Sequence, residues 1–235
     1  MYYANPEARA TQARLRLEQW RKILMQADAA GPRYADETIC ELLGSASVAA
    51  MAEIESFMRD LVESIIYTIN ETKCPISSLR PELHILHAHT TFDSIRKLES
   101  RNNSYWRSRI NVTQLHFSQD TALLPGPSTK NPQPPLRGNT IALRDISDIA
   151  TILCFPHSPS ILLNSPQIAA LKKLSGYRNS FAHATVAPRE IFPKPRREIS
   201  KIIDDIDRIS DVLDLLSNEW NAVTAGKLFL TSAAL

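Results

Sequence analysis

Hydrophobic residues recur every three or four positions over most of the chain, which is the spacing of one face of an α-helix. This pattern predicts helices over residues 6–29, 34–70, 81–99, 143–154 and 198–223, and a further helix that begins at Ser165. Proline and glycine punctuate these segments, with Gly31-Pro32 ending the first and Cys74-Pro75 ending the second. The chain is therefore expected to be mainly helical.

The first and last of these helices show the expected division into two faces. Five apolar residues form the core side of the first helix: Leu15, Leu17, Trp20, Ile23 and Leu24. In the last helix seven aliphatic residues share one face, namely Ile199, Ile202, Ile203, Ile206, Ile209, Leu213 and Leu216, whereas Asp204, Asp205, Asp207 and Arg208 are expected to face solvent. For the helix that follows Pro159, Ser165 is the expected N-cap and Pro166 the first helical residue.

Residues 100–139 break the helical pattern. Five prolines, at positions 125, 127, 132, 134 and 135, fall within eleven residues, and neither a helix nor an inner strand tolerates that density. Only six glycines occur in 235 residues, too few for the regular turns of a sheet-rich fold. The sequence thus predicts an all-α antiparallel helical bundle that forms a single domain, 1–235, with an irregular proline-rich insertion at 100–139.

Composition narrows the class of protein. Three cysteines, Cys40, Cys74 and Cys154, lie far apart without CxxC spacing, as expected for a reduced cytoplasmic protein. The first residues lack the apolar core of a signal peptide, and no run of 18 apolar residues predicts a membrane helix. The formal net charge is +2, so any attraction to nucleic acid must come from local basic clusters. We expect a soluble intracellular protein that does not bind a membrane.

The stretch Gly176 to Ala184, GYRNSFAHA, combines residues suited to acid–base chemistry on a phosphodiester. A histidine such as His183 titrates near neutral pH and can accept or donate a proton, while Arg178 can stabilise the negative charge of a phosphoryl transition state. Asn179 can orient the phosphate or the histidine ring. On an ideal helix five steps of about 100° separate Arg178 and His183 by roughly 140°. The pair therefore needs a distorted helix end or a second copy of the site.

This stretch resembles the Arg-polar-x-x-Ala-His motif of the HEPN superfamily, all-helical domains of prokaryotic toxins and phage-defence ribonucleases, and the layout is similar to the RiboL-PSP type. The resemblance assigns the arginine to Arg178, the polar follower to Asn179 and the histidine to His183. It implies a homodimer through the motif-bearing face and RNA cleavage without a metal or cofactor, in a toxin-antitoxin or antiviral system with an antitoxin or defence-complex partner. Residues 1–30 then form an additional helix beside the family-like part.

Two basic clusters are candidate RNA-binding sites because arginine and lysine bind phosphates and aromatic rings stack on bases. The first lies in residues 101–109 and the second in residues 189–201. The candidates are Arg101, Tyr105, Trp106, Arg107 and Arg109 in the first, and Arg189, Lys194, Arg196 and Arg197 in the second.

Other readings of these residues stay open. Arg178 could instead pair with a carboxylate and His183 cap helix carbonyls, and a HEPN-like domain without activity could act as an adaptor in a defence complex. His84, His87 and His89 have helical spacing, but no acid or cysteine at a matching step favours a metal site. The histidine at 157 lies three residues after Cys154, which does not by itself make an activated nucleophile.

Overall fold

Helices account for nearly all of the regular structure, as the sequence predicts. A computed structural model describes residues 5–97, 103–125, 141–182 and 186–232. In these ranges there is no β-strand, and the extended segments contribute two isolated bridges, Pro75 with Thr121 and Leu79 with Leu230. The α-helices are α1 (Pro6–Ala30), α2 (Asp36–Thr72), α3 (Pro81–His87), α4 (His89–Lys97), α5 (Asn103–Gln114), α6 (Leu143–Ile152), α7 (Pro159–Leu162), α8 (Ser165–Ala182), α9 (Pro188–Ile191) and α10 (Pro195–Ala225).

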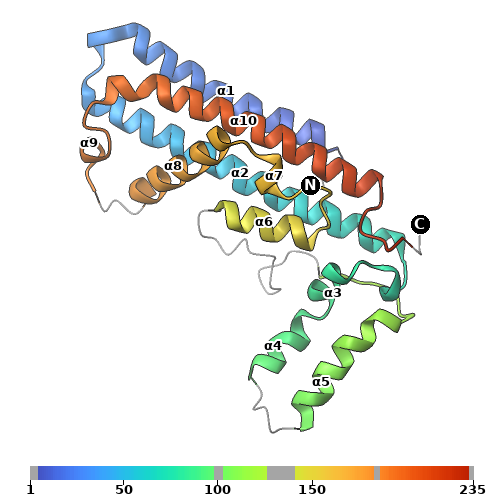
Figure 1. Cartoon of the computed structure of the whole chain (residues 1–235). Coiled ribbons are helices and arrows are strands. Elements are labelled where there is room, and N and C mark those ends of the chain that lie inside the picture. The colour runs from blue at the N-terminus through green and yellow to red at the C-terminus, as the bar shows by residue number, and fades with distance from the viewer. Residues whose placement is uncertain (1–4, 98–102, 126–140, 183–185, 233–235) are drawn as a thin grey trace.

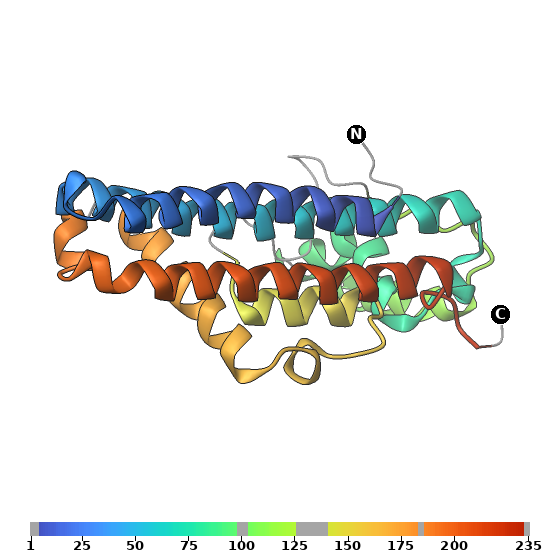
Figure 2. The same cartoon turned by 90° about the horizontal axis from the view of Figure 1, so that it is seen from above.

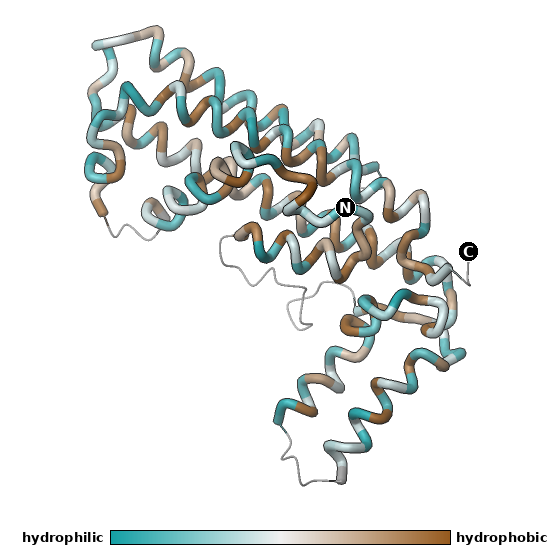
Figure 3. The backbone as a smooth tube through the Cα atoms, in the orientation of Figure 1, coloured by the Kyte–Doolittle hydropathy of each residue, from teal (hydrophilic) through white to brown (hydrophobic). Residues whose placement is uncertain are grey.

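Three long helices, α1, α2 and α10, form the body of the molecule (Figures 1 and 2). Helix α8 packs against α2 and α10, while α6 lies on the same side of the body. Hydrophobic and hydrophilic residues alternate around the long helices in Figure 3, in keeping with one buried stripe on each. In the core between α2 and α10 the rings of Phe57 and Trp220 meet edge to face, with centroids 5.6 Å apart.

Helix α1 packs closely on the body because its buried face is made largely of small residues. Asn5 caps its start, since the side-chain oxygen accepts hydrogen bonds from the backbone N–H of Glu7 and Ala8. The buried residues are Pro6, Arg9, Ala10, Ala13, Leu17, Leu24 and Ala27. The expectation that Leu15 and Ile23 belong to the core was wrong: both are exposed, because the interhelical contact follows the alanine stripe.

A buried arginine fastens α1 to α2. The Arg9 side chain is 1% exposed, and its Nε donates to the Asp60 carboxylate at 2.5 Å. One terminal nitrogen donates to the Ser56 hydroxyl at 3.0 Å, and the other lies 3.7 Å from the Glu53 carboxylate. Because a buried charge is tolerated only when it is paired, this cluster fixes the position of α1.

Two segments differ from the sequence-based prediction. The expected helix 81–99 is divided at Ala88 into α3 and α4, and Leu98 and Glu99 lie outside the described residues. Residues 103–117, expected to be irregular, form α5 and the 3-10 turn η3 (Leu115–Phe117). The proline-rich part, 126–140, is outside the described ranges. The polar composition of α5 masked its helical character because only a weak apolar stripe marks it.

Helices α4 and α5 form an arm that projects from one end of the body (Figure 1). Its base is held by hydrogen bonds between residues 74–77 and 118–122, including Ser77 N–H to the carbonyl of Ser118 (3.0 Å) and Ala122 N–H to that of Cys74 (2.8 Å). Asn70, near the end of α2, bonds both backbone groups of Leu124. Within the described residues, no helix combines the length and apolar character needed to cross a bilayer.

Candidate functional site

Helix α8 carries Arg178 and Asn179 of the motif, and its two ends are fixed in different ways. At the start, the Asn164 side chain accepts the N–H of Gln167 (3.0 Å), and the Gln167 side chain accepts the N–H of Asn164 (2.9 Å). This reciprocal pair makes Asn164 the N-cap in place of the expected Ser165. Ala170, Leu171 and Leu174 then bury one face of the helix and direct the motif toward the end of the body.

Aromatic packing anchors the end of α8 beneath the motif. The rings of Tyr177 and Phe181 lie 4.8 Å and 6.4 Å from that of Phe192, which is fully buried. Phe181 also occupies the space beside Gly44 on α2, where a Cβ would be 2.0 Å from the ring. Because Gly44 has no side chain, α8 and α2 approach closely at the point from which the motif projects.

We expect Gly44→Ala to lower the free energy of unfolding by about 1–3 kcal/mol, because Phe181 must leave its place on α2. Gly176→Ala is the matched control, since a methyl group there meets nothing within 4 Å and alanine favours a helix by about 1 kcal/mol. Denaturant unfolding of the two variants should shift in opposite directions. Equal shifts would contradict the proposed packing of Phe181.

Arg178 and Asn179 lie together on the accessible end of α8. Arg178 is half-buried and donates to the Asn179 side-chain oxygen at 3.4 Å, while Asn179 is exposed. In the described ranges no carboxylate pairs with Arg178. His183, the predicted proton-transfer residue, lies outside the described residues. The geometry therefore covers two of the three predicted catalytic residues, and both are accessible.

A buried carboxylate that the sequence analysis missed lies near this helix. Asp205 on α10 was expected to face solvent, but it is 3% exposed, forms an ion pair with Lys173 of α8 (2.8 Å) and accepts a hydrogen bond from Arg208 (3.0 Å). Its position between Ile202 and Ile209 on the buried stripe of α10 was the available signal. Burial also raises the pKa of Tyr177, so the phenol next to Arg178 stays protonated at neutral pH.

The second basic cluster divides into paired and unpaired residues. Arg189 forms ion pairs with Glu37 and Asp36, and Arg196 pairs with Asp36 at 3.1 Å. Arg196 also donates to the carbonyls of Gly31 and Tyr34, so it holds the turn between α1 and α2. Lys194 and Arg197 are exposed and have no ion pair among the described residues. The charge of the cluster is therefore partly neutralised by the chain itself.

The first basic cluster does not lie beside the motif. Tyr105, Trp106, Arg107 and Arg109 are on α5, and Arg101 lies outside the described residues. Figures 1 and 2 both place the α4–α5 arm toward the end of the body away from α9, which follows the motif. The structure thus places the first of the two clusters of candidate RNA-binding residues away from the motif.

Two of the histidines near α3, His84 and His89, have backbone partners. His84 is buried, and its Nε2 lies 3.0 Å from the carbonyl oxygen of Ile76. The pKa of His84 is lowered from its usual value, mainly because of this burial. The ring of His84 lies 4.8 Å from that of His116 at an interplanar angle of 58°, and Nδ1 of His89 lies 3.0 Å from the carbonyl of Leu86. In the part of the chain that the structure describes, no three His, Cys, Asp or Glu side chains are grouped to hold a metal ion.

The cysteine and histidine near position 155 form no nucleophilic pair. Cys154 is buried, and burial raises the pKa of its thiol to about 12, so it stays protonated. His157 bonds instead to Glu219 of α10, whose carboxylate accepts the backbone N–H at 3.0 Å and lies 2.8 Å from Nδ1. Glu219 is 5% exposed, and this contact fastens the segment after α6 to α10.

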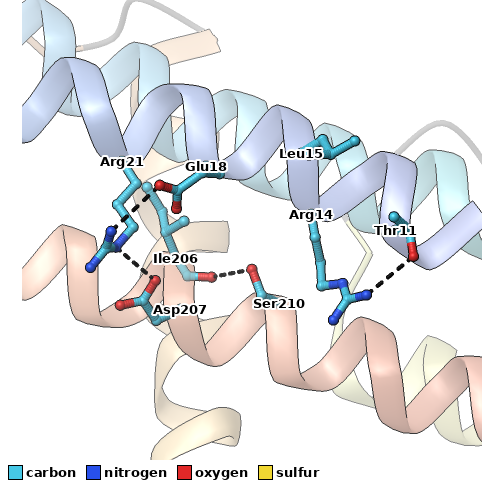
Figure 4. A pocket seen from close by; sticks show the side chains of 8 residues that line it. All are labelled: Thr11, Arg14, Leu15, Glu18, Arg21, Ile206, Asp207 and Ser210. Carbon is cyan, nitrogen blue, oxygen red and sulfur yellow. Dashed lines mark hydrogen bonds and ion pairs between the residues drawn. The ribbon is translucent and has the colours of Figure 1, made fainter.

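A shallow groove of about 340 Å³ runs between α1 and α10 (Figure 4). Arg14 in its wall donates to Thr11 (3.1 Å) and pairs with Asp214 (3.0 Å), while Arg21 pairs with Asp207 (3.2 Å). Arg14 and Arg21 of α1 are thus neutralised by Asp214 and Asp207 of α10. The groove joins two helices and does not include the motif.

No family model matches the sequence, and comparisons with curated proteins and with solved structures find no significant match. The resemblance to the HEPN superfamily therefore rests on the motif residues and their helical context.

Proposed function

We propose that the protein is a metal-independent endoribonuclease of HEPN type, whose site is formed by Arg178, Asn179 and His183. One observation carries the proposal. The guanidinium of Arg178 is accessible at the end of α8 and has no carboxylate partner among the described residues, whereas Arg189 and Arg196 are paired with acids. An unpaired arginine beside an exposed amide is suited to bind a phosphate.

The reaction is an attack of the ribose 2′-oxygen on the adjacent phosphorus. His183 accepts the 2′-hydroxyl proton as the new P–O bond forms, and the bond to the 5′-oxygen breaks as that oxygen receives a proton. Arg178 stabilises the added charge on the phosphate oxygens, and Asn179 orients the phosphate. The products are a 2′,3′-cyclic phosphate and a 5′-hydroxyl.

A second copy of the chain supplies the missing acid. One histidine cannot accept one proton and donate another in the same step, and an ideal helix places Arg178 and His183 roughly 140° apart. A two-fold dimer through the accessible ends of two α8 helices brings two motifs to one phosphate. In a toxin or antiviral effector, a partner protein that covers the accessible end of α8 would inhibit the cleavage.

The test is RNA cleavage by the purified full-length protein at neutral pH in the presence of EDTA. We expect cleavage by the wild type, products that end in 2′,3′-cyclic phosphate, and loss of both in His183→Ala. Growth arrest on expression should follow the same pattern. RNA that stays intact with the wild type, or cleavage that persists in His183→Ala, would overturn the proposal and favour a non-catalytic adaptor.

A further inference from the structure

Several large apolar side chains of the α4–α5 arm are exposed. In the described part of α4 and α5 no side chain is fully buried, whereas Phe92 is 40%, Trp106 56% and Ile110 53% exposed. Phe117, directly after α5, is 81% exposed. Trp106 and Ile110 are one turn apart on α5 and so share one face, and Phe117 follows in η3.

Three side chains on α5 form a cluster of two rings and one cation. The rings of Tyr105 and Trp106 meet edge to face at 5.6 Å, and the guanidinium of Arg109 lies 5.2 Å from the first and 5.4 Å from the second. Arg109 also donates to the Tyr105 hydroxyl at 3.0 Å. The guanidinium is held by cation–π contacts and one neutral hydrogen bond, so its charge stays available to an anion.

The arm is basic, and this charge favours a polyanionic ligand over a second copy of the chain. Its described residues include one acid, Asp93, against Arg96, Lys97, Arg107 and Arg109. No ion pair neutralises these four cations within the described ranges. Two arms facing each other would bring like charges together, so a second copy is disfavoured. A polyanion that also carries flat aromatic groups can pair with the cations and stack on the rings.

We propose that the α4–α5 arm binds single-stranded RNA, with a base stacked on Trp106 and phosphates bound by Arg107 and Arg109. The choice of RNA over DNA rests on the proposed function. Asn111 and Gln114, exposed on the same helix, provide amide groups for the bases or sugars. Because the arm lies toward the end of the body away from α9, it binds the substrate outside the cleavage site (Figure 1).

The test measures binding of a fluorescent oligouridylate of about 15 nucleotides to the full chain carrying His183→Ala, which prevents cleavage. We expect Trp106→Ala to weaken binding about thirtyfold, the midpoint of the loss for one stacked base, without changing the salt dependence. Arg107→Ala with Arg109→Ala should reduce the slope of log affinity against log salt by about 1.4. Exposed Leu15 and Arg14 on α1 are the matched control, and their alanine variants should bind normally.

The two proposals fail separately. Unchanged affinity in the arm variants would overturn the arm as a binding site even if the protein cleaves RNA. Loss of affinity in those variants, with Arg178→Ala binding normally, would support the arm whether or not cleavage is found. No binding by the parent protein would overturn the proposal and leave the apolar face of α5 to a protein partner.

Discussion

Arg178→Ala should lower the rate of RNA cleavage about 10²–10³-fold, the usual loss when one preorganised donor to a transition-state oxyanion is removed. This substitution should leave the rest of the fold undisturbed. Arg178 bonds to its neighbour Asn179 at 3.4 Å and pairs with no carboxylate in the described ranges, so no buried charge is left without a partner. Single-turnover cleavage under EDTA measures the effect, and thermal unfolding checks that the fold is kept.

Lys172→Ala is the control for the loss of a positive charge on the same helix, because Lys172 is exposed and lies outside the motif. It should retain the wild-type rate. Arg178→Lys should recover part of the loss, since lysine keeps the charge but lacks the planar fork that binds two phosphate oxygens. A rate for Arg178→Ala equal to that of the wild type would remove Arg178 from the reaction.

Arg9→Met should lower the free energy of unfolding by about 3–5 kcal/mol, the cost of breaking a buried ion pair by removing one partner. Methionine replaces the stem of the arginine but leaves Asp60 without its cation between α1 and α2, whereas Glu53 keeps Arg16 at 2.9 Å. Because Asp60 is 20% exposed, water relieves part of the penalty, and we expect a value near the lower limit. Urea unfolding gives the difference directly.

Arg14→Met on the same helix is the matched comparison. Arg14 also pairs with an aspartate, Asp214, but both side chains are more than 40% exposed. Its replacement should cost less than about 1 kcal/mol, as for other surface ion pairs. Similar losses in the two variants would mean that Arg9 contributes no more than a surface arginine.

The long helices were predictable because their apolar residues repeat with the helical period and proline or glycine marks their ends. The stripe from Met51 to Ile69 on α2 is buried as the pattern indicates, and so is that from Ile199 to Leu216 on α10, except for Ile203, which is only partly buried. Exposed Leu15 and buried Asp205 show the limit of this reasoning. Burial depends on which face meets a neighbouring helix, and that contact joins residues far apart in the sequence.

The candidate site was only partly predictable for the same reason. The adjacency of Arg178 and Asn179 follows from the motif itself. Phe181 packs beside Gly44, and Arg189 and Arg196 pair with acids at the start of α2. These contacts connect segments about 140 to 160 residues apart. The position of the arm away from the motif depends on the path of the whole chain, which no local pattern encodes.

Helix α1, which the family resemblance treats as an addition, is an integral part of the core. It pairs with α10 along most of its length and supplies Arg9 to the carboxylates of α2. A shortened version that starts at residue 31 would expose the apolar stripe of α10 and leave Glu53 and Asp60 of α2 without Arg9. The smallest portion that can be expressed and studied as a folded unit therefore has to begin upstream of Pro6.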